Sequence, residues 1–389
     1  MYEFPKIDFK KLQEDRREGV RQLMKAKNID HILITMYDNI RYATDFQALL
    51  VMDCYDFFTA LVDSSAEATL FLPFLDTDIL SPHPDLPWIK RQIAGPSWTP
   101  NWVAENIWLK KVSEEIKREG AKRVGVELLT YQLFEALRTE FKNIEFIPVA
   151  LELLKLRQIK TKEEIQLLEA ASVVNSLAMA EARDRMFEGM TDFEVLAIIK
   201  NRMQKCGAEF ITHGVAVTKG TPSKENWFAV GNRLWEGDKI TLDIGCNGKG
   251  GYASDIARTF CVGEPPTAVT KGWKGLLKAY QAGQDIARPG ANVSTITRTI
   301  NEALKKQGLP KTPYGMGHGI GLRAGELPHI YSQDLMAKDA VLEKGMVICI
   351  EPSTVVEVKG SPTNLKVEDV FVVESNGLRR LSPCGYGLT

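Results

Sequence analysis

The chain has 389 residues, long enough for two domains with separate cores. Its formal net charge is −1, so no basic excess attracts the phosphates of nucleic acid or an anionic membrane. No stretch approaches the roughly 18 consecutive apolar residues that a membrane span requires, and the N-terminus shows no signal peptide. These features predict a cytoplasmic protein whose partners are small molecules or other protein surfaces.

The first part of the chain alternates helical and strand patterns. A charged amphipathic pattern predicts a helix from Phe9 to Lys27, and the apolar run HILITM (31–36) predicts a strand. Further expected elements are strands at TLFLPFL (69–75), RVGVEL (123–128) and FIPV (146–149) and a helix near Val112 to Glu119. Alternation of this kind predicts a small α/β domain.

The second part of the chain opens with two helices that carry capping boxes. Thr161 with Glu164, and Thr191 with Glu194, each place a hydroxyl three residues before a Glu at the start of a helical pattern. Beyond residue 210 the sequence is strand-like with Gly-rich turns. Two further helices are expected there, around Trp273 to Ile286 and Val293 to Gln307. A pair of helices followed by strands thus occurs twice, which fits a duplicated layout.

Two acids are predicted to meet in a hairpin. In KITLDIGCNGKGGYASDIARTF (239–260), two strand-like segments flank the turn-rich CNGKGG, which brings Asp243 and Asp255 to the same end. Both lie next to apolar residues, where an unpaired buried carboxylate is costly. A cation is therefore expected beside them.

Three further residues have the same character. Glu351 follows an apolar run in GMVICIEPS (345–353), Glu368 lies within LKVEDVFVVE (365–374), and His318 stands among glycines in GHGIGL (317–322). Four acids and a histidine in such segments are the donors that a carboxylate-bridged pair of divalent metals requires. An oxygen-rich set with one imidazole suits Mn, Co, Zn or Fe.

Taken in order, these motifs resemble the metal ligands of the pita-bread metallohydrolases, the family of methionine aminopeptidase, aminopeptidase P, prolidase and creatinase. The matching pieces are LDIG at Asp243, SDIART at Asp255, GHGIGL at His318, IEPS at Glu351 and VEDVFVV at Glu368. The resemblance covers residues 158–389, and the preceding part is similar to the smaller domain of aminopeptidase P, prolidase and creatinase. It implies an α/β domain, residues 1–155, followed by a pita-bread catalytic domain of α+β type, residues 156–389.

The resemblance also implies a role for each residue. Asp243 would chelate one of two metal ions, and Asp255 and Glu368 would bridge both. His318 would bind the second ion, and Glu351 would complete its shell. Glu351 would also be the general base in an attack by metal-activated water on an amide-like carbon.

Two positions depart from the peptidases of this family, which have two further histidines for substrate and transition state. One stands 17 residues before the first ligand Asp, where this chain has Asn226, and the other stands seven after the ligand His, where it has Gly325. Asn cannot exchange a proton near neutral pH, and Gly has no side chain to do so. The candidate substrate contacts are Asn226, Tyr314, His213 and His329.

The leading functional prediction is a dinuclear metal-dependent hydrolase that cleaves a C–N bond. Because both histidines are missing beside a complete ligand set, we expect a small amide-like substrate that is not a standard dipeptide, such as a cyclic or amidine-type compound. The alternatives are an Xaa-Pro dipeptidase or aminopeptidase, a metal-dependent lyase resembling dimethylsulfoniopropionate lyase, and a non-catalytic binding protein. The lyase has an acidic residue where this chain reads RAG after His318, and binding-only relatives have lost ligands, so these two alternatives fit less well.

The remaining expectations concern assembly, the cysteines and one arginine. A homodimer is implied by the resemblance, and the aromatic segments DCYDFF (53–58) and PSWTPNW (96–102) are candidate contact surfaces. The six cysteines have no CxxC spacing and are expected to be buried thiols. Arg258 is expected to pair with one of the ligand carboxylates.

Overall fold

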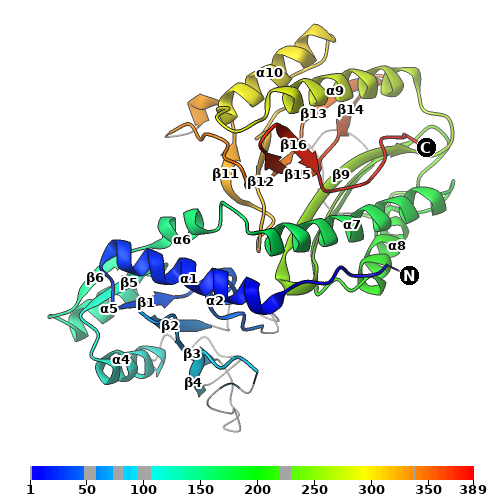
Figure 1. The fold of residues 1–389 in the computed structure, drawn as a ribbon. Coiled ribbons are helices and arrows are strands. Elements are labelled where there is room, and N and C mark those ends of the chain that lie inside the picture. The colour runs from blue at the N-terminus through cyan, green and yellow to red at the C-terminus, as the bar shows by residue number, and fades with distance from the viewer. Residues whose placement is uncertain are drawn as a thin grey trace. The chain divides into compact units, whose positions relative to one another are not determined.

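The structure is a computed structural model that describes residues 2–47, 58–72, 83, 85–94, 107–218, 229–335 and 338–389. Figure 1 shows the two compact units of the chain, residues 8–157 and residues 158–389, the second of which also includes residues 2–7. These N-terminal residues join the second unit because Tyr2 donates a hydrogen bond to the Ala170 carbonyl at 3.4 Å and the Lys249 ammonium lies 5.1 Å from the Phe4 ring centre. Within the described ranges, no helix combines the length and apolar character that crossing a membrane demands.

The first unit is a mixed six-stranded sheet with helices, as the alternating pattern predicted. The strand order is β4-β3-β2-β1-β5-β6. The strands are β1 His31–Ile34, β2 Thr59–Asp63, β3 Ala68–Leu72, β4 Ile89–Ala94, β5 Arg123–Val126 and β6 Glu145–Pro148. The helices are α1 Phe9–Lys27, α2 Tyr37–Thr44, α4 Ile107–Glu119, α5 Tyr131–Glu140 and α6 Ala150–Leu156.

The core of the first unit lies between the sheet and helices α4 and α5. Trp108 and Val112 of α4 and Leu137 of α5 are fully buried against strand residues such as Leu33 and Phe71. Burial of such large apolar side chains stabilises a domain by roughly 1.5–3 kcal/mol each. The unit therefore has a hydrophobic core of its own.

The second unit follows the predicted order of two helices and then strands, repeated once. Its helices are α7 Lys162–Arg185, α8 Asp192–Lys205, α9 Thr267–Ile286 and α10 Val293–Lys306, with short 3-10 turns η1 Lys249–Gly251 and η2 Gln333–Leu335. Its strands are β7 Phe210–Val217, β8 Lys239–Asn247, β9 Ala253–Cys261, β10 Gly317–Gly319, β11 Glu326–Ile330, β12 Val347–Ile350, β13 Ser353–Val358, β14 Ser361–Lys366, β15 Asp369–Glu374 and β16 Gly377–Arg380.

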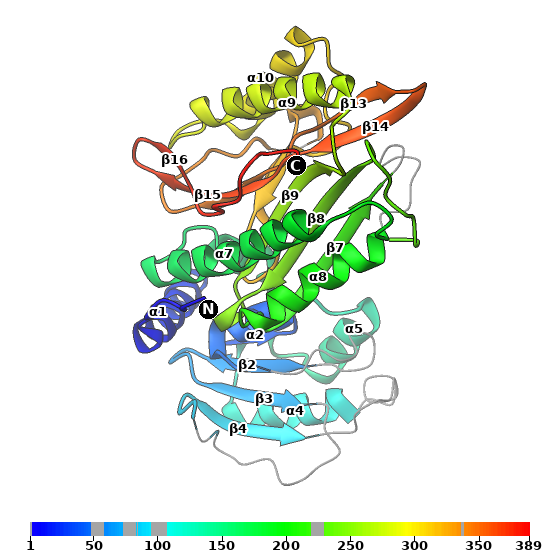
Figure 2. The same cartoon turned by 90° about the vertical axis from the view of Figure 1, so that its right-hand side faces the viewer.

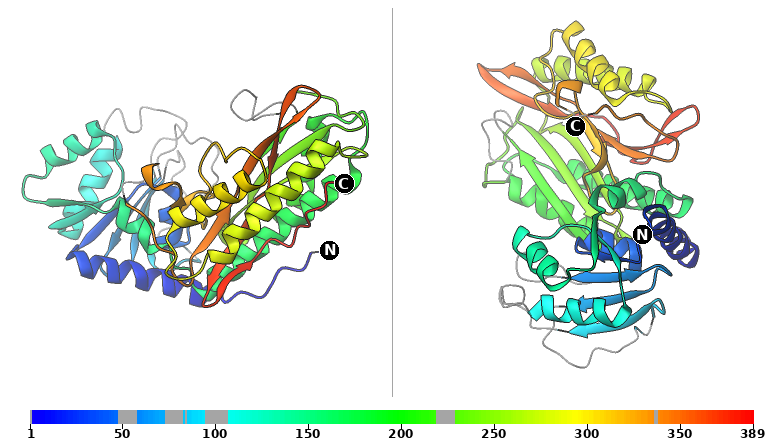
Figure 3. Two further views of the ribbon diagram at one scale, coloured as in Figure 1. Left: turned by 90° about the horizontal axis from the view of Figure 1, so that it is seen from above. Right: turned by 90° about the vertical axis from the view of Figure 1, so that its left-hand side faces the viewer.

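Both predicted capping boxes are present at the starts of α7 and α8. Figure 2 shows α7 and α8 along one face of the sheet β7-β8-β9, and the second helix pair, α9 and α10, packs side by side in Figure 3. Asn175 of α7 donates a hydrogen bond to the Ile244 carbonyl at 3.0 Å and so ties the helix to β8 next to Asp243. Helix α9 begins at Thr267, earlier than predicted, directly after Pro266 at its N-cap.

The remaining strands form a five-stranded sheet, β11-β10-β12-β15-β16, and a hairpin, β13-β14. A bridge between Ala257 of β9 and Glu368 joins the segment before β15 to the three-stranded sheet. This bridge brings the two sheets together where the predicted metal ligands lie.

Arg258 is completely buried, but it does not pair with a predicted ligand carboxylate. It donates to Asp369 Oδ1 at 2.6 Å and to the backbone carbonyl of Glu368 at 2.6 Å. Successive side chains of a strand point to opposite faces, so Arg258 lies on the other face of β9 from Asp255. Tyr280 and Tyr386 also donate to the Asp369 carboxylate, each at 2.8 Å.

Replacing Arg258 tests this buried pair. In Arg258→Met the buried Asp369 carboxylate would lose its closest cation and keep Arg380 at 3.9 Å, so we expect the free energy of unfolding to fall by about 3–5 kcal/mol, measured by urea denaturation. The control is Arg379→Met, which removes exposed ion pairs to Glu374 and Glu169 and should cost about 0–1 kcal/mol. Equal losses in the two variants would contradict the prediction.

Candidate metal centre

Two acids come from adjacent strands of the three-stranded sheet. In the antiparallel register of β8 and β9, Asp243 pairs with Ala257 and Gly245 pairs with Asp255. Asp243 and Asp255 are therefore diagonal neighbours on the same face, within reach of a common ligand. The hairpin predicted from the sequence does bring these two carboxylates together.

The other three predicted ligands come from the five-stranded sheet. His318 lies on β10, which pairs with β12, while Glu351 directly follows β12 and Glu368 directly precedes β15. The strands approach closely because of glycine: a Cβ at Gly317 or at Gly319 would lie 2.0 Å from a backbone carbonyl oxygen. The glycines around His318 thus allow tight backbone packing, as the sequence suggested.

The imidazole of His318 faces three of the acids. Its Nε2 lies 3.9 Å from Asp255 Oδ2, 3.7 Å from Glu351 Oε1 and 3.9 Å from Glu368 Oε1. Its Nδ1 lies 3.0 Å from the Gly319 carbonyl, which can only accept a hydrogen bond, so Nδ1 carries a proton. All five residues expected as metal ligands therefore converge in one place.

Lys366 also lies in this cluster, and sequence reasoning missed it. Its ammonium is 2.6 Å from Asp243 Oδ2, 2.8 Å from Glu351 Oε2 and 3.1 Å from Glu368 Oε2. One signal was available: Lys366 stands two residues before Glu368 in an extended segment, so both side chains point the same way. Burial opposes the charge of Lys366, but the surrounding carboxylates raise its pKa well above the ordinary value.

His213, expected only as a substrate contact, lies beside the first two acids. Its Nε2 is 3.2 Å from Asp243 Oδ1 and 3.2 Å from Asp255 Oδ1. Although burial by itself lowers it, the Asp255 and Asp243 carboxylates raise the pKa of His213 to about 11. The pKa of Asp243 is held well below its usual range, against the effect of burial, by Lys366 and His213.

The donor set fits divalent cations. Oδ1 of Asp255 and both carboxylate oxygens of Glu368 are buried and make ion-pair contacts, with no hydrogen bond to any described residue. Burial and the neighbouring Asp255 raise the pKa of Glu368 well above its ordinary value, which reflects a shortage of positive charge. Carboxylate oxygens with imidazole nitrogens are suitable ligands for several transition metals.

The other candidate substrate contacts are less directly placed. The ring centre of Tyr314 lies 5.9 Å from the Lys366 ammonium, and burial raises the pKa of this phenol, so it stays protonated. His329 is exposed and its ring stacks on Tyr331 with centroids 5.3 Å apart. Asn226 lies outside the described residues.

The described cysteines are free thiols, as predicted. Those that are buried are Cys246, Cys261, Cys349 and Cys384, while Cys206 is partly buried and Cys54 lies outside the described residues. Cys349 Sγ lies within 4.8 Å of donor atoms of His318 and Glu368. Burial and the adjacent carboxylates raise the pKa of the Cys349 thiol well above its ordinary value.

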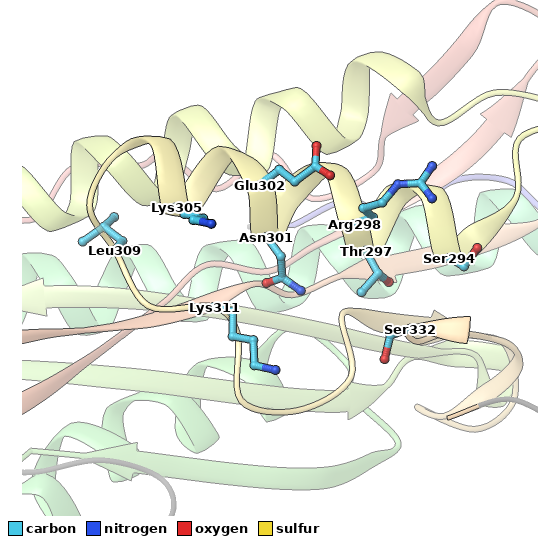
Figure 4. A pocket seen from close by; sticks show the side chains of 9 residues that line it. All are labelled: Ser294, Thr297, Arg298, Asn301, Glu302, Lys305, Leu309, Lys311 and Ser332. Carbon is cyan, nitrogen blue, oxygen red and sulfur yellow. The ribbon is translucent and has the colours of Figure 1, made fainter. Parts of the chain in front are cut away.

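A hollow of about 600 Å³ lies beside α10, away from these ligands. Figure 4 shows its lining, which includes the cationic side chains Arg298, Lys305 and Lys311 and none of the acids described above. Surface lysines and an arginine without a buried polar partner do not constitute a catalytic set. The chemistry of the second unit is therefore concentrated at the carboxylate cluster.

Comparison with known proteins gives matches to both units of the chain. Residues 166–375, more than half of the chain, match the model of metallopeptidase family M24, and residues 16–159 match the creatinase/prolidase N-terminal domain. An Xaa-Pro dipeptidase of Pyrococcus furiosus is 28% identical over 378 residues, covering 95% of this chain and 98% of the relative. The solved prolidase from Pyrococcus furiosus superimposes with a TM-score of 0.75 at 25% identity, over 94% of this chain and 99% of that one. A prolidase from Pyrococcus horikoshii shares the fold, with a TM-score of 0.78 at 24% identity over 96% of this chain and 100% of that one.

Removing Lys366 tests whether its ammonium balances the acids. In Lys366→Met three carboxylates lose their nearest cation, so we expect the metal-free variant to be less stable by about 3–5 kcal/mol. Added Mn²⁺ should raise its melting temperature more than that of the wild type, because the ion replaces the missing charge. The measurement is thermal unfolding with chelator and with Mn²⁺.

Lys278→Met is the matched control for this experiment. Lys278 is exposed on α9, so its replacement should change stability by no more than about 0.5 kcal/mol. The same metal-dependent shift in Lys366→Met and in the wild type would show that Lys366 does not compensate the acids.

Proposed function

The chain belongs to metallopeptidase family M24, and on this premise we propose that it hydrolyses a C–N bond at the carboxylate cluster, with Xaa-Pro dipeptides as the first substrate class. The observation that carries the proposal is the convergence of four acids and His318 from two sheets. The names of the relatives support the dipeptide substrate better than the non-dipeptide substrate expected from the sequence. We therefore revise that expectation and place the dipeptide first.

Divalent cations are the proposed cofactors, two per chain, held by Asp243, Asp255, His318, Glu351 and Glu368. When bound, such ions would polarise the carbonyl group of the substrate. They would also make water a nucleophile at neutral pH. Carboxylate oxygens together with an imidazole nitrogen suit Mn, Co, Zn and Fe, so these are the ions to test. Asp255 and Glu368 are the proposed bridges, as the family resemblance implies. Each faces His318 through one oxygen and a second basic group through the other, His213 for Asp255 and Lys366 for Glu368.

Glu351 is the proposed general base. Its side chain is 15% exposed, so a water molecule can approach it, and its Oε2 is bound to Lys366 at 2.8 Å. Oε1 lies 3.7 Å from His318 Nε2, farther than Oε2 lies from the Lys366 ammonium, and is the freer oxygen to accept a proton. The contact with Lys366 holds this carboxylate in position.

A second candidate, hydrolysis of a small cyclic or amidine-type compound, is favoured by one specific observation. Gly325 is exposed, and a Cβ at this position would have no heavy atom within 4 Å. The space that a histidine would fill in related peptidases is therefore open, and the proton donor is missing. A substrate that needs no proton at this point would suit such a site.

Assembly and location stay predictions. The homodimer is proposed from the family resemblance, because DCYDFF and PSWTPNW lie outside the described residues, apart from Phe58. A cytoplasmic location is proposed from the same sequence features as before.

A substrate screen tests the proposed function. Metal-stripped protein should be inactive, and Mn, Co, Zn or Fe should restore release of proline from Ala-Pro or Leu-Pro, measured by chromatography. Because two proton-bearing positions are absent, we expect turnover below the roughly 10 s⁻¹ that is typical of enzymes. Glu351→Gln should reduce turnover by about 10²–10⁴ because it removes the base.

The control variant is Glu343→Gln, which changes an exposed acid and should leave turnover unaltered. Cleavage of a cyclic or amidine compound in the absence of any Xaa-Pro hydrolysis would replace the first substrate class with the second. Equal turnover in Glu351→Gln and wild type would exclude Glu351 as the base.

Position 325 provides a gain-of-function test. Gly325→His should fold, because the position is open, and should raise Xaa-Pro turnover on the order of tenfold or more by supplying a proton donor. Gly325→Gln, which adds a polar side chain without a titrating proton, is the matched control and should not raise it. Comparable kcat/KM for all three proteins would mean that a histidine at this position contributes nothing here.

A further inference from the structure

His213 occupies a position between two of the proposed ligands. It lies on β7, the neighbour of β8, and in register with Gly245. Its Nε2 and one oxygen each of Asp243 and Asp255 lie within 4.8 Å of one another. The backbone order of the sheet thus adds a nitrogen donor to a pair of carboxylates.

We infer that His213 is itself a metal ligand, which completes the Asp243–Asp255 side of the centre and gives each of the two metal positions one imidazole. The inference rests on the proposed metal-dependent function. It assigns to His213 a place in the metal centre instead of the substrate contact that the sequence suggested. Three independent features of the fold support it.

The first feature is the spacing of the donor atoms. Ligand atoms that share one cation at about 2.1 Å lie about 3.0–3.4 Å from each other in tetrahedral or octahedral arrangements. The distances from His213 Nε2 to Asp243 Oδ1 and to Asp255 Oδ1 are both 3.2 Å. The corresponding distances from His318 to its acids are longer, 3.7–3.9 Å. The His213 side of the cluster therefore already has the spacing of a coordination shell.

The second feature is the space that Gly245 leaves. A Cβ at this position would lie 2.3 Å from His213 Cε1 and 2.6 Å from His213 Nδ1, closer than any real contact. The imidazole therefore rests directly over Gly245, in the row of the sheet that continues to Asp255. With any larger residue at 245, the ring could not lie between the two acids.

The third feature is how the ring is oriented. His213 Nδ1 lies 3.0 Å from the Thr212 hydroxyl, as His318 Nδ1 lies 3.0 Å from the Gly319 carbonyl. Anchoring one ring nitrogen fixes the other toward the metal, a usual arrangement for ligating histidines. Both imidazoles thus present Nε2 to the acids.

Asp255 connects the two sides. Its Oδ1 faces His213 at 3.2 Å and its Oδ2 faces His318 at 3.9 Å. A carboxylate placed in this way can bind one cation through each oxygen. Because both sides then contain a nitrogen donor, the centre should prefer Zn, Co or Fe to the oxygen-seeking ions Mg and Ca.

The first test uses the wild-type protein loaded with zinc. X-ray absorption of the full chain counts imidazoles around the metal, and zinc content is measured by mass spectrometry. If His213 and His318 both bind zinc, the two zinc ions share two imidazoles, an average of one imidazole per zinc ion. If His318 is the one histidine ligand, the average is one imidazole for every two zinc ions. The lower count would overturn the inference with no variant required. Protein that binds none of Zn, Mn, Co and Fe would overturn the proposed function as well.

The second test uses variants and isothermal titration with Zn²⁺. His213→Gln should keep one tight equivalent and weaken the other at least about 100-fold, since even partners behind a ligand contribute 10–100-fold to affinity. Gly245→Ala keeps every proposed ligand residue in the sequence but displaces the His213 ring, and it should weaken the same equivalent. The matched control, His83→Gln, alters a histidine of the first unit and should titrate like the wild type. Two unchanged equivalents in His213→Gln would leave the proposed function intact and refute the role of His213.

Discussion

The mutual repulsion of four carboxylates that converge inside the second unit is the constraint on which the rest of the site depends. Such a cluster is unstable unless positive charge lies within a few ångströms, because burial removes the water that would otherwise solvate it. Before any metal binds, Lys366 meets three of the acids and His213 meets two, so part of the compensation is built into the chain. The remainder is the role proposed for divalent cations.

The backbone makes this convergence possible. Strand alternation sends Asp255 into the site and Arg258 away from it, where the buried arginine holds the backbone of Glu368 and the side chain of Asp369. The same β9 therefore has a charged network on each face. Glycines at 245 and 317 remove the side chains that would keep His213 and the neighbouring strands apart. Rigid sheets on both sides hold the donors in position.

Charge compensation and proton transfer are separable in this protein. The acids, His318 and Lys366 form a complete cluster, whereas Gly325 leaves open space where related peptidases have a histidine. A metal-dependent hydrolase can retain binding and activation of water while it loses a proton donor, at a cost in rate for substrates whose leaving group must be protonated. This explains how a chain of the M24 family can combine a full donor set with an unusual substrate contact region.

The amino-acid sequence by itself determined the local features. The capping boxes at Thr161 and Thr191 and the hairpin that brings Asp243 close to Asp255 depend on residues close together in the chain. Side-chain periodicity also determined which face each residue occupies, a signal that was available for Lys366 and Arg258. The predicted start of α9 was less accurate. The helix begins directly after Pro266 at its N-cap, before the apolar pattern of the sequence becomes clear.

Only the tertiary structure decided which faces meet. Lys366 reaches Asp243 across 123 residues of sequence, and His213 reaches Asp255 through the pairing of β7 with β8 and of β8 with β9. Arg258 likewise pairs with Asp369 because the segment before β15 forms a bridge to β9. Periodicity states which way a side chain points, but the neighbour that it meets depends on the packing of strands distant in sequence. For that physical reason the sequence indicated the five candidate ligands, but not that Lys366 and His213 lie among their carboxylates.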